Sequence, residues 1–344
     1  MPARHPSGGP QFSTDPARAA AALLAGSLVA LPTETVYGLA AVASDRTAVA
    51  RVFEVKRRPA DHPLIVHVES LASARQWVQE FPEPAAELAR RYWPGPLTLV
   101  LPRAPWVPDE VTGGQPTVAL RVPDHPLTAR VLALVGLGLA GPCGLVAPSA
   151  NAFGRVSPTS AADVMASLGG RLGPADLILD GGECRVGLES TIVDATGERL
   201  RVLRPGAVLV DRAAALAGDA VGVAPAAAAG TGAPGAVPRV PGSHSTHYAP
   251  AAEVVIANEE ELLAAWAPMD PDAGSTGFLA PAGIETPAGW LRLASPADDV
   301  AFAAVLYRGL RAADDAGLHR IVVVPPTTGG MLPAILDRLR RAAS

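Results

Sequence analysis

The polar segment with the clearest chemical potential is residues 32–38, which read Pro-Thr-Glu-Thr-Val-Tyr-Gly and directly follow a predicted strand at 28–31. Hydroxyl groups donate and accept hydrogen bonds, and a glycine lets the backbone approach a ligand closely. Two threonines, a carboxylate and a glycine at a strand end therefore suit a small polar ligand. An ordinary turn is the competing interpretation.

A second group is cationic, because Lys56, Arg57 and Arg58 end a predicted helix just before Pro59. Arginine binds phosphate oxygens through two parallel hydrogen bonds, and lysine supplies a compact charge that can follow a migrating phosphoryl group. Lys56 is the only lysine among the 28 lysine and arginine residues. This favours a phosphate-binding loop over a helix end that is merely enriched in basic residues. No Gly-x-x-x-x-Gly-Lys-Ser/Thr sequence occurs, so a P-loop nucleotidase is excluded.

Two predicted strands carry side chains that could meet a ligand. His67 lies in the strand 64–68, and Arg121 shares one face of the strand 117–122 with Thr117. A buried arginine requires an anionic partner, and a substrate carboxylate would serve. A histidine in a strand is otherwise commonly a satisfied core or surface residue.

Further hydroxyl, amide and cationic groups stand in segments that each read as an ordinary turn when taken alone. They lie at residues 148–151, 157–159, 187–191 and 203–206. Neither cysteine lies near a histidine in the sequence, and no Gly-x-Ser-x-Gly elbow is present. These polar groups therefore suit ligand binding and charge stabilisation better than a covalent intermediate.

The elements that must position these residues form a mixed pattern of strands and helices. Capping residues at 13–16 open a helix that Gly26 ends. Strand-like runs follow at 28–31, 64–68, 97–101, 117–122, 145–147, 177–179 and 191–193, and helical runs at 47–56, 84–92, 127–135 and 161–168. This order predicts one α/β domain over residues 13–206.

The rest of the chain is predicted to be a linker and a second domain. Residues 213–240 are mostly alanine, glycine and proline, a composition typical of linkers, and the predicted linker spans 207–251. The second domain, 252–344, has strand-like runs at 253–257 and 321–324 and helical runs at 259–266, 297–316 and 331–341. This alternation predicts a small parallel sheet.

The composition favours a globular protein of two domains, with 344 residues and a hydrophobic fraction of 49%. The net charge of −5 argues against a protein that coats nucleic acid non-specifically, although a local basic groove stays open. With two cysteines and no Cys/His cluster, a zinc site or disulfide scaffold is disfavoured and a reducing compartment is expected. No signal-peptide pattern or uninterrupted apolar span is present, which predicts a cytoplasmic protein without membrane segments.

Taken in order, these segments resemble the threonylcarbamoyl-AMP synthase family in its long form, which joins a YrdC-like domain to a C-terminal extension. The resemblance is carried by residues 32–38, 56–68, 92–98, 117–126, 148–151, 187–194 and 203–206, with residues 247–250 matching the interdomain segment. It implies a YrdC-like twisted open α/β sheet with a positively charged concave face. A smaller Rossmann-like parallel-sheet domain would follow.

The resemblance also implies an activity, the formation of threonylcarbamoyl-AMP and pyrophosphate from L-threonine, bicarbonate and ATP with Mg²⁺. A partner enzyme, a threonylcarbamoyl transferase, would then modify the tRNA adenosine next to the anticodon, and tRNA itself is a candidate partner. Carried over by motif, the residues around threonine are Thr35, His67, Arg121, Ser190 and the backbone of Ala147. Those around ATP are Lys56, Arg58, His62, Thr117, Ser149, Asn151, Ser157 and Arg204, with Tyr248 closing over the nucleotide. Lys56 and Arg58 are the expected catalytic residues, and no protein metal ligands are expected.

Two places depart from the family pattern. His62 stands where the family usually has asparagine, so the ATP contact expected there depends on a different side chain. Ser245 and Thr246 replace a tyrosine and a basic residue of the interdomain segment, so closure of the linker is expected to depend mainly on His247 and Tyr248.

The expected chemistry needs positioning and charge neutralisation rather than a protein nucleophile. The threonine amine captures carbon dioxide or bicarbonate, and the N-carboxylate attacks the α-phosphate beside Lys56, Arg58 and Mg²⁺. Two other functions stay open: a double-stranded-RNA or tRNA-binding module without catalysis, and an enzyme that forms carbamoyl-adenylate from carbamoyl phosphate. The acidic net charge and the aromatic content of 4% count against the first, and the lack of a Cys-rich segment counts against the second.

Overall fold

The computed structural model describes residues 8–197, 199–208, 222–223, 237–242, 248–258 and 273–344. The chain divides into a first unit, Met1–Phe153 with Pro158–Cys184 and Glu189–Ser243, and a second unit, Gly154–Ser157 with Arg185–Leu188 and His244–Ser344. The helix predicted at 259–266 and most of the predicted linker lie outside the described residues. The domain boundaries at 13–206, 207–251 and 252–344 stay predictions.

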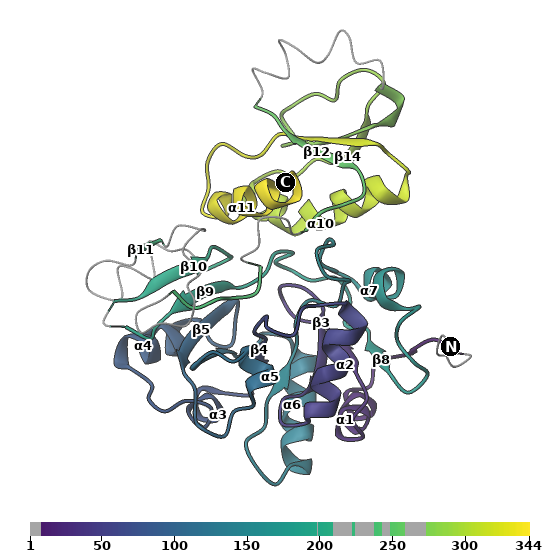
Figure 1. Cartoon of the computed structure of the whole chain (residues 1–344). Coiled ribbons are helices and arrows are strands. Elements are labelled where there is room, and N and C mark those ends of the chain that lie inside the picture. Colours follow the sequence, from purple (N-terminus) through teal and green to yellow (C-terminus); the bar gives the residue numbers. More distant parts are fainter. Residues whose placement is uncertain (1–7, 198, 209–221, 224–236, 243–247, 259–272) are drawn as a thin grey trace. The chain divides into compact units, whose positions relative to one another are not determined.

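The first unit confirms the predicted mixed α/β fold and is built on one large sheet (Figure 1). Its strands, in spatial order, are β1 (Gln11–Ser13), β8 (Leu177–Leu179), β2 (Val29–Leu31), β3 (Gly38–Val42), β7 (Leu145–Val146), β4 (Ile65–His67), β6 (Thr117–Arg121), β5 (Leu97–Pro102), β9 (Thr191–Asp194), β10 (Arg201–Arg204) and β11 (Gly222–Val223). Its helices are α1 (Pro16–Leu24), α2 (Arg46–Lys56), α3 (Leu71–Arg75), α4 (Glu83–Tyr92), α5 (Asp109–Thr112), α6 (Pro126–Gly138) and α7 (Ala161–Leu168).

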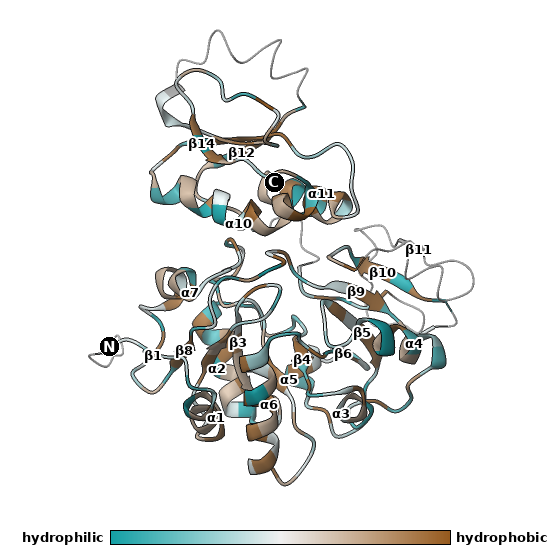
Figure 2. Cartoon of the chain, turned by 180° about the vertical axis from the view of Figure 1, so that it is seen from behind, coloured by the Kyte–Doolittle hydropathy of each residue, from teal (hydrophilic) through white to brown (hydrophobic). Residues whose placement is uncertain are grey.

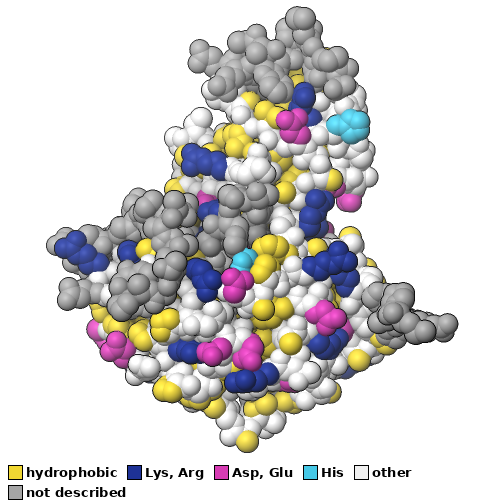
Figure 3. Space-filling model, viewed as in Figure 1, with side chains coloured by type: hydrophobic (Ala, Val, Ile, Leu, Met, Phe, Trp, Pro, Cys, Tyr) yellow, Lys and Arg dark blue, Asp and Glu magenta, His cyan; other side chains and the backbone are white. Residues whose placement is uncertain are grey.

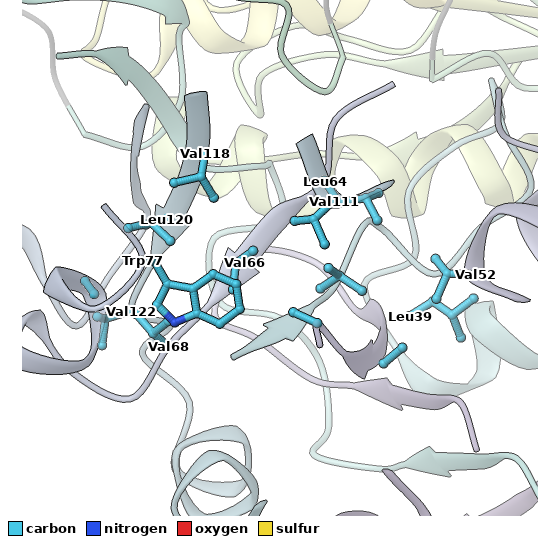
Figure 4. Packing of buried hydrophobic residues seen from close by; sticks show 14 of the residues in the cluster. Leu39, Val52, Leu64, Val66, Val68, Trp77, Val111, Val118, Leu120 and Val122 are labelled. Atoms are coloured by element: carbon cyan, nitrogen blue, oxygen red, sulfur yellow. The ribbon is translucent and has the colours of Figure 1, made fainter. Parts of the chain in front are cut away.

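Strand alternation separates the two faces of this sheet at β4 and β6, which pair in parallel with His67 opposite Arg121. Val66 and Leu120 belong to the main core and lie beside the fully buried indole of Trp77 (Figure 4). Because successive side chains of a strand point to opposite faces, His67 and Arg121 point away from this core. The core thus determines which face receives the polar side chains.

A second apolar cluster fixes the other side of the sheet around β2. It joins α1 and α6 to the strands β2, β3, β7 and β8, and includes Leu23, Leu31 and Val135. Hydrophobic residues, brown in Figure 2, follow these strands and the helices beside them. The capping predicted for α1 is confirmed, since Asp15 accepts a hydrogen bond from the N–H of Ala17 (2.8 Å).

The second unit confirms the predicted small parallel sheet. Its strand order is β12 (Glu253–Ile256), β15 (Arg320–Val323), β13 (Thr276–Leu279) and β14 (Leu291–Ala294), and all its pairings are parallel. A 3₁₀ helix, η2 (Ala273–Ser275), and the helices α10 (Asp299–Asp315) and α11 (Leu332–Ala342) complete the described part. Phe278, Trp290 and Val322 form its core. Among all described residues, no helix has the length and apolar character needed to cross a membrane.

Candidate functional site

The loop between β2 and β3 folds around the hydroxyl of Thr33. Its Oγ1 accepts hydrogen bonds from the backbone N–H groups of Thr35 (3.1 Å) and Val36 (3.2 Å) and donates to the Val36 carbonyl (2.7 Å). Thr35 Oγ1 lies 2.8 Å from the same oxygen. Because the single hydroxyl proton of Thr33 is already used, Thr35 is the donor of this bond. The turn therefore fixes the fully buried Thr35 side chain.

The guanidinium of Arg121 joins this loop to β6. Its Nη2 donates to Thr35 Oγ1 (2.9 Å) and pairs with Glu34 Oε1 (2.8 Å), while Nε donates to the carbonyl of Gly95 (3.3 Å). The side chains of Arg121 and Glu34 are only 4% and 1% exposed, so they form a buried ion pair. The structure thus supplies an anionic partner for Arg121 inside the chain, where the sequence analysis considered a substrate carboxylate.

Glu34 is held through both of its carboxylate oxygens. Oε2 accepts a hydrogen bond from the N–H of Asp124 (3.1 Å), just before α6, and Thr128 of α6 donates to the carbonyl of Pro32. From the sequence, Glu34 is only one of several polar groups of residues 32–38 that suit a small ligand, and its pairing with Arg121 was not predicted. The available signal was that it is the only carboxylate in residues 32–38, while Arg121 on a buried strand needed an anion.

His67 lies beside Arg121 in the sheet and is buried. Desolvation by burial, followed by the positive charge of Arg121, lowers the pKa of His67 from 6.5 to about 3. The imidazole is therefore neutral near pH 7. It can take part in hydrogen bonding but adds no positive charge to the site.

Ser190 lies in the same unit, directly before β9. Its Oγ lies 2.7 Å from Thr98 Oγ1 and accepts a hydrogen bond from Arg204 Nη2 (3.1 Å), and its carbonyl accepts from Arg204 Nε (3.2 Å) and Nη2 (2.9 Å). The N–H of Thr191 donates to the carbonyl of Pro96 (2.9 Å), the residue after the glycine that Arg121 contacts. Ser190 is thus linked to the Arg121 region. Arg204 orients Ser190, and its expected contact with ATP stays a prediction.

Lys56, the last residue of α2, is buried and faces backbone carbonyls. Its Nζ donates to the carbonyls of Asn151 (2.6 Å) and Ser149. Desolvation, with smaller contributions from Arg58 and Arg171, lowers the pKa of Lys56 well below its usual range. The only lysine of the chain is therefore positioned by carbonyl oxygens rather than by a carboxylate.

Arg58 and His62 share one aromatic neighbour, Phe153. The guanidinium carbon of Arg58 lies 5.9 Å from the centroid of the Phe153 ring, and the His62 ring centroid lies 5.3 Å from it. Arg58 Nη2 also donates to the carbonyl of Pro63 (2.9 Å), and the N–H of Phe153 donates to the carbonyl of Lys56 (2.9 Å). The cationic segment is thereby wrapped around the end of α2.

The segment 147–151 contacts both groups of polar residues. The first group surrounds Arg121 and includes Thr35, Glu34, His67 and Ser190, and the second surrounds Lys56 and includes Arg58 and His62. The N–H of Ala150 donates to the carbonyl of Tyr37 (2.8 Å), two residues after Thr35, and Gly38 forms an isolated β-bridge with Ser149. A Cβ on Gly38 would lie 2.9 Å from both the Cβ and the carbonyl oxygen of Ala147, closer than such atoms approach. Only glycine allows this contact, which brings the Thr35 loop against the carbonyls that hold Lys56.

The structure places three further predicted site residues as follows. Thr117 begins β6, four residues before Arg121, which corresponds to about 13 Å along a strand. Ser157 is buried in the second unit. Tyr248, also in the second unit, adopts a left-handed φ of 65° and stacks on Tyr307 with ring centroids 5.5 Å apart. Ser245, Thr246 and His247 lie outside the described residues.

The described residues contain no group of three His, Cys, Asp or Glu side chains that could hold a metal ion. Mg²⁺ is commonly bound through substrate phosphates and water, with few protein ligands. Mg²⁺ that enters bound to the phosphates of ATP would therefore need few ligands from the protein, and the hydroxyls and carbonyls of the site offer it oxygen atoms. The need for Mg²⁺ stays a proposal.

Comparison with known proteins matches both parts of the chain to family models. Residues 21–206 match a family model described as "Telomere recombination", and residues 209–344 match one described as "Threonylcarbamoyl-AMP synthase, C-terminal domain". The two matches together span nearly the whole sequence.

Individual relatives resemble the chain over most of their length. A threonylcarbamoyl-AMP synthase of Pyrococcus abyssi is 38% identical over 327 residues, which cover 92% of this chain and 91% of the relative. One of Bacillus subtilis is 35% identical over 333 residues, covering 95% and 92%. The solved structure of P. abyssi Sua5 complexed with L-threonine has a TM-score of 0.82 at 36% identity, covering 97% of this chain and 96% of that one.

Proposed function

The chain belongs to the threonylcarbamoyl-AMP synthase family, and we propose that it forms threonylcarbamoyl-AMP and pyrophosphate from L-threonine, bicarbonate and ATP. It is a nucleotidyltransferase. One observation supports the roles proposed for individual residues: a single segment contacts both the group around Arg121 and the group around Lys56. Residues 147–151 touch the Thr35 loop on one side and supply the carbonyls that hold Lys56 on the other.

In this proposal the first group binds threonine. Arg121 carries a guanidinium edge that can take the substrate carboxylate, and charge-assisted hydrogen bonds of this kind are the strong ones. Thr35 Oγ1 donates to Thr33 and accepts from Arg121, so its remaining lone pair can accept one hydrogen bond from the amine or hydroxyl of threonine. Neutral His67 and Ser190 would complete the pocket without adding charge.

The second group is proposed to bind the triphosphate. Lys56 and Arg58 are both buried, and their side chains contact main-chain carbonyls, those of Ser149 and Asn151 for Lys56 and that of Pro63 for Arg58. A bound triphosphate would favour the protonated form of Lys56, whose pKa burial lowers, and phosphate oxygens could accept hydrogen bonds from both side chains. Ser149 and Asn151 border the same position, because their carbonyls hold Lys56 Nζ. Mg²⁺ bound to the phosphates would supply further neutralisation of negative charge.

The chemistry follows from this arrangement. The threonine amine attacks bicarbonate and releases water, which leaves an N-carboxylate. One oxygen of that N-carboxylate attacks the α-phosphorus of ATP, a new P–O bond forms, and the bond to the β-phosphate oxygen breaks to release pyrophosphate. Lys56 and Arg58 stabilise the charge that develops on the phosphate oxygens, and Arg121 and Thr35 hold the attacking group in place. No step requires a covalent bond to the protein.

The product is a mixed anhydride of a carbamate and a phosphate, which an acyl acceptor must consume. We propose that a threonylcarbamoyl transferase passes the group to tRNA. A pure RNA-binding role is disfavoured on the face seen in Figure 3, where Lys and Arg side chains of the first unit are interspersed with Asp and Glu rather than gathered in one patch.

The decisive experiment is an assay of pyrophosphate release from ATP with mass detection of the adenylate. We expect release only when threonine and bicarbonate are both present. Turnover with carbamoyl phosphate in place of these two substrates would instead identify a carbamoyl-adenylate-forming enzyme. RNA affinity with a steep salt dependence and no threonine-dependent turnover would identify a binding module.

A further inference from the structure

The side chain of Glu34 has a part in the amino-acid site that the proposed function does not yet use. We propose that Glu34 is a positioning residue: it holds the guanidinium of Arg121 so that the Nη1 edge is presented to the carboxylate of the amino-acid substrate. This inference rests on the proposed function, because it needs an amino acid as the ligand of Arg121.

The donor count of Arg121 supports this orientation. A guanidinium has five N–H groups, one on Nε and two on each terminal nitrogen. Nε donates to Gly95 (3.3 Å), Nη2 donates to Thr35 Oγ1 (2.9 Å), and Oε1 of Glu34 lies 2.8 Å from the same Nη2 as an ion-pair partner. Within the described part of the chain, Nη1 has no acceptor. The fork is therefore fixed on one side and leaves two donors for a ligand.

Glu34 supplies the only charged restraint among these three contacts of Arg121. Thr35 and Gly95 offer neutral oxygens, whereas the carboxylate attracts the guanidinium through its opposite charge, and this attraction is stronger in a buried site than in water. Its own position is fixed, because its second carboxylate oxygen accepts from the N–H of Asp124 (3.1 Å) and its side chain is 1% exposed. A rigid carboxylate thus defines where Arg121 points.

Glu34 also neutralises Arg121, and this second effect has the opposite sign. Removal of the negative charge would by itself strengthen attraction of a substrate carboxylate to Arg121. Loss of orientation would weaken binding, because arginine recognises a carboxylate through the geometry of its fork. We assign the larger effect to orientation, since both donors of Nη1 must align with one carboxylate.

The test compares Michaelis constants for the two substrates in Glu34→Gln. Glutamine keeps the shape of the side chain and can still accept from Asp124, but it lacks the charge that holds Arg121. We expect KM for threonine to rise at least about tenfold, while KM for ATP stays within about twofold. The matched control is Asp176→Asn, which removes the charge of another buried carboxylate, paired with Arg51 at 2.9 Å. It should lower thermal stability and leave KM for threonine unchanged.

Glu34→Asp distinguishes the effect of orienting Arg121 from the effect of neutralising its charge. It also tests the proposal if Glu34→Gln does not fold. Aspartate keeps the negative charge but withdraws the carboxylate by one methylene group, so orientation predicts a raised KM for threonine here too. Wild-type behaviour of Glu34→Asp, or a lowered KM for threonine in Glu34→Gln, would overturn the proposal. Absence of threonine-dependent pyrophosphate release in the wild-type protein would instead refute the proposed function.

Discussion

The two groups of the candidate site hold buried cations in different ways. Arg121 is paired with a carboxylate, Glu34, at 2.8 Å. Lys56 is held by main-chain carbonyls instead, those of Ser149 and Asn151. Carbonyl oxygens orient a cation without cancelling its net charge, whereas a carboxylate cancels it.

This difference matches the charges of the two proposed ligands. A zwitterionic amino acid carries no net charge and suits the neutral pair of Arg121 with Glu34. A triphosphate is strongly negative and suits Lys56, whose carbonyl partners do not cancel a positive charge. The partners of the buried cations, more than the cations themselves, therefore indicate which ligand each group binds.

The largest expected effect tests the carbonyl-held group. In Lys56→Ala the developing charge at the α-phosphate loses a fixed partner, so kcat for pyrophosphate release should fall by about 10²–10³, since one such donor contributes about 3–4 kcal/mol. The control is Arg57→Gly, which removes the neighbouring exposed charge at a left-handed φ of 52° and should leave kcat nearly unchanged. Near-normal turnover of Lys56→Ala would remove Lys56 from the mechanism.

The next effect tests the carboxylate-paired group. Arg121→Gln removes the proposed partner of the threonine carboxylate, and charge-assisted hydrogen bonds contribute about 1.5–3 kcal/mol. KM for threonine should therefore rise about 10–100-fold, while KM for ATP should change little. Steady-state kinetics with each substrate varied in turn measures both. Equal effects on the two Michaelis constants would contradict the division into two groups.

A smaller effect is expected at the link between β5 and Ser190. Thr98→Val keeps the shape of the side chain but removes the hydroxyl that lies 2.7 Å from Ser190 Oγ. A single neutral hydrogen bond contributes about 0.5–1.5 kcal/mol, so kcat/KM for threonine should fall about 3–10-fold. Thr98→Ser restores the hydroxyl and should recover most of the loss. If both variants behave alike, the hydroxyl does not orient Ser190.

The smallest effect at neutral pH concerns His67, whose pKa of about 3 in the folded chain lies below the unfolded value of 6.5. Below pH 6.5 the unfolded chain binds a proton that the folded chain refuses until about pH 3, so stability falls as the pH drops through this range. His67→Gln should flatten that fall. Urea unfolding at several values between pH 7 and 4 measures it, and an unchanged slope would mean that His67 is protonated in the folded protein.

Many strands could be predicted because the alternation of side chains between the two faces of a strand can be read from neighbouring residues in the sequence. The strands of β4 and β6 alternate apolar residues with His67 and Arg121, and both side chains lie on the face opposite Trp77 as alternation requires. β3 (Gly38–Val42) was not predicted, because its uniformly buried small and apolar residues show no alternation. A strand buried on both faces has no sequence period to read.

The site was predicted less completely, for a physical reason. Residue types indicated that Thr35 and Arg121 could act together, and the structure joins them at 2.9 Å. The carbonyls that hold Lys56 could not be predicted, because every residue has a carbonyl and only the fold decides which ones meet the amine. The pairing of Arg121 with Glu34 likewise depends on a contact between segments far apart in the sequence.

The contact of Gly38 with Ala147 has a consequence for tolerance to mutation. Even one added carbon at Gly38 would meet the Ala147 carbonyl oxygen at 2.9 Å, so the two segments would have to separate. Leu39 and Ala150 beside this contact belong to the same core as Trp77, and Ala147 packs against the cluster of α6, so separation of the two segments would also open both clusters. A substitution at Gly38 would therefore lower stability and misalign the two substrates at once, so that this position limits folding and catalysis together.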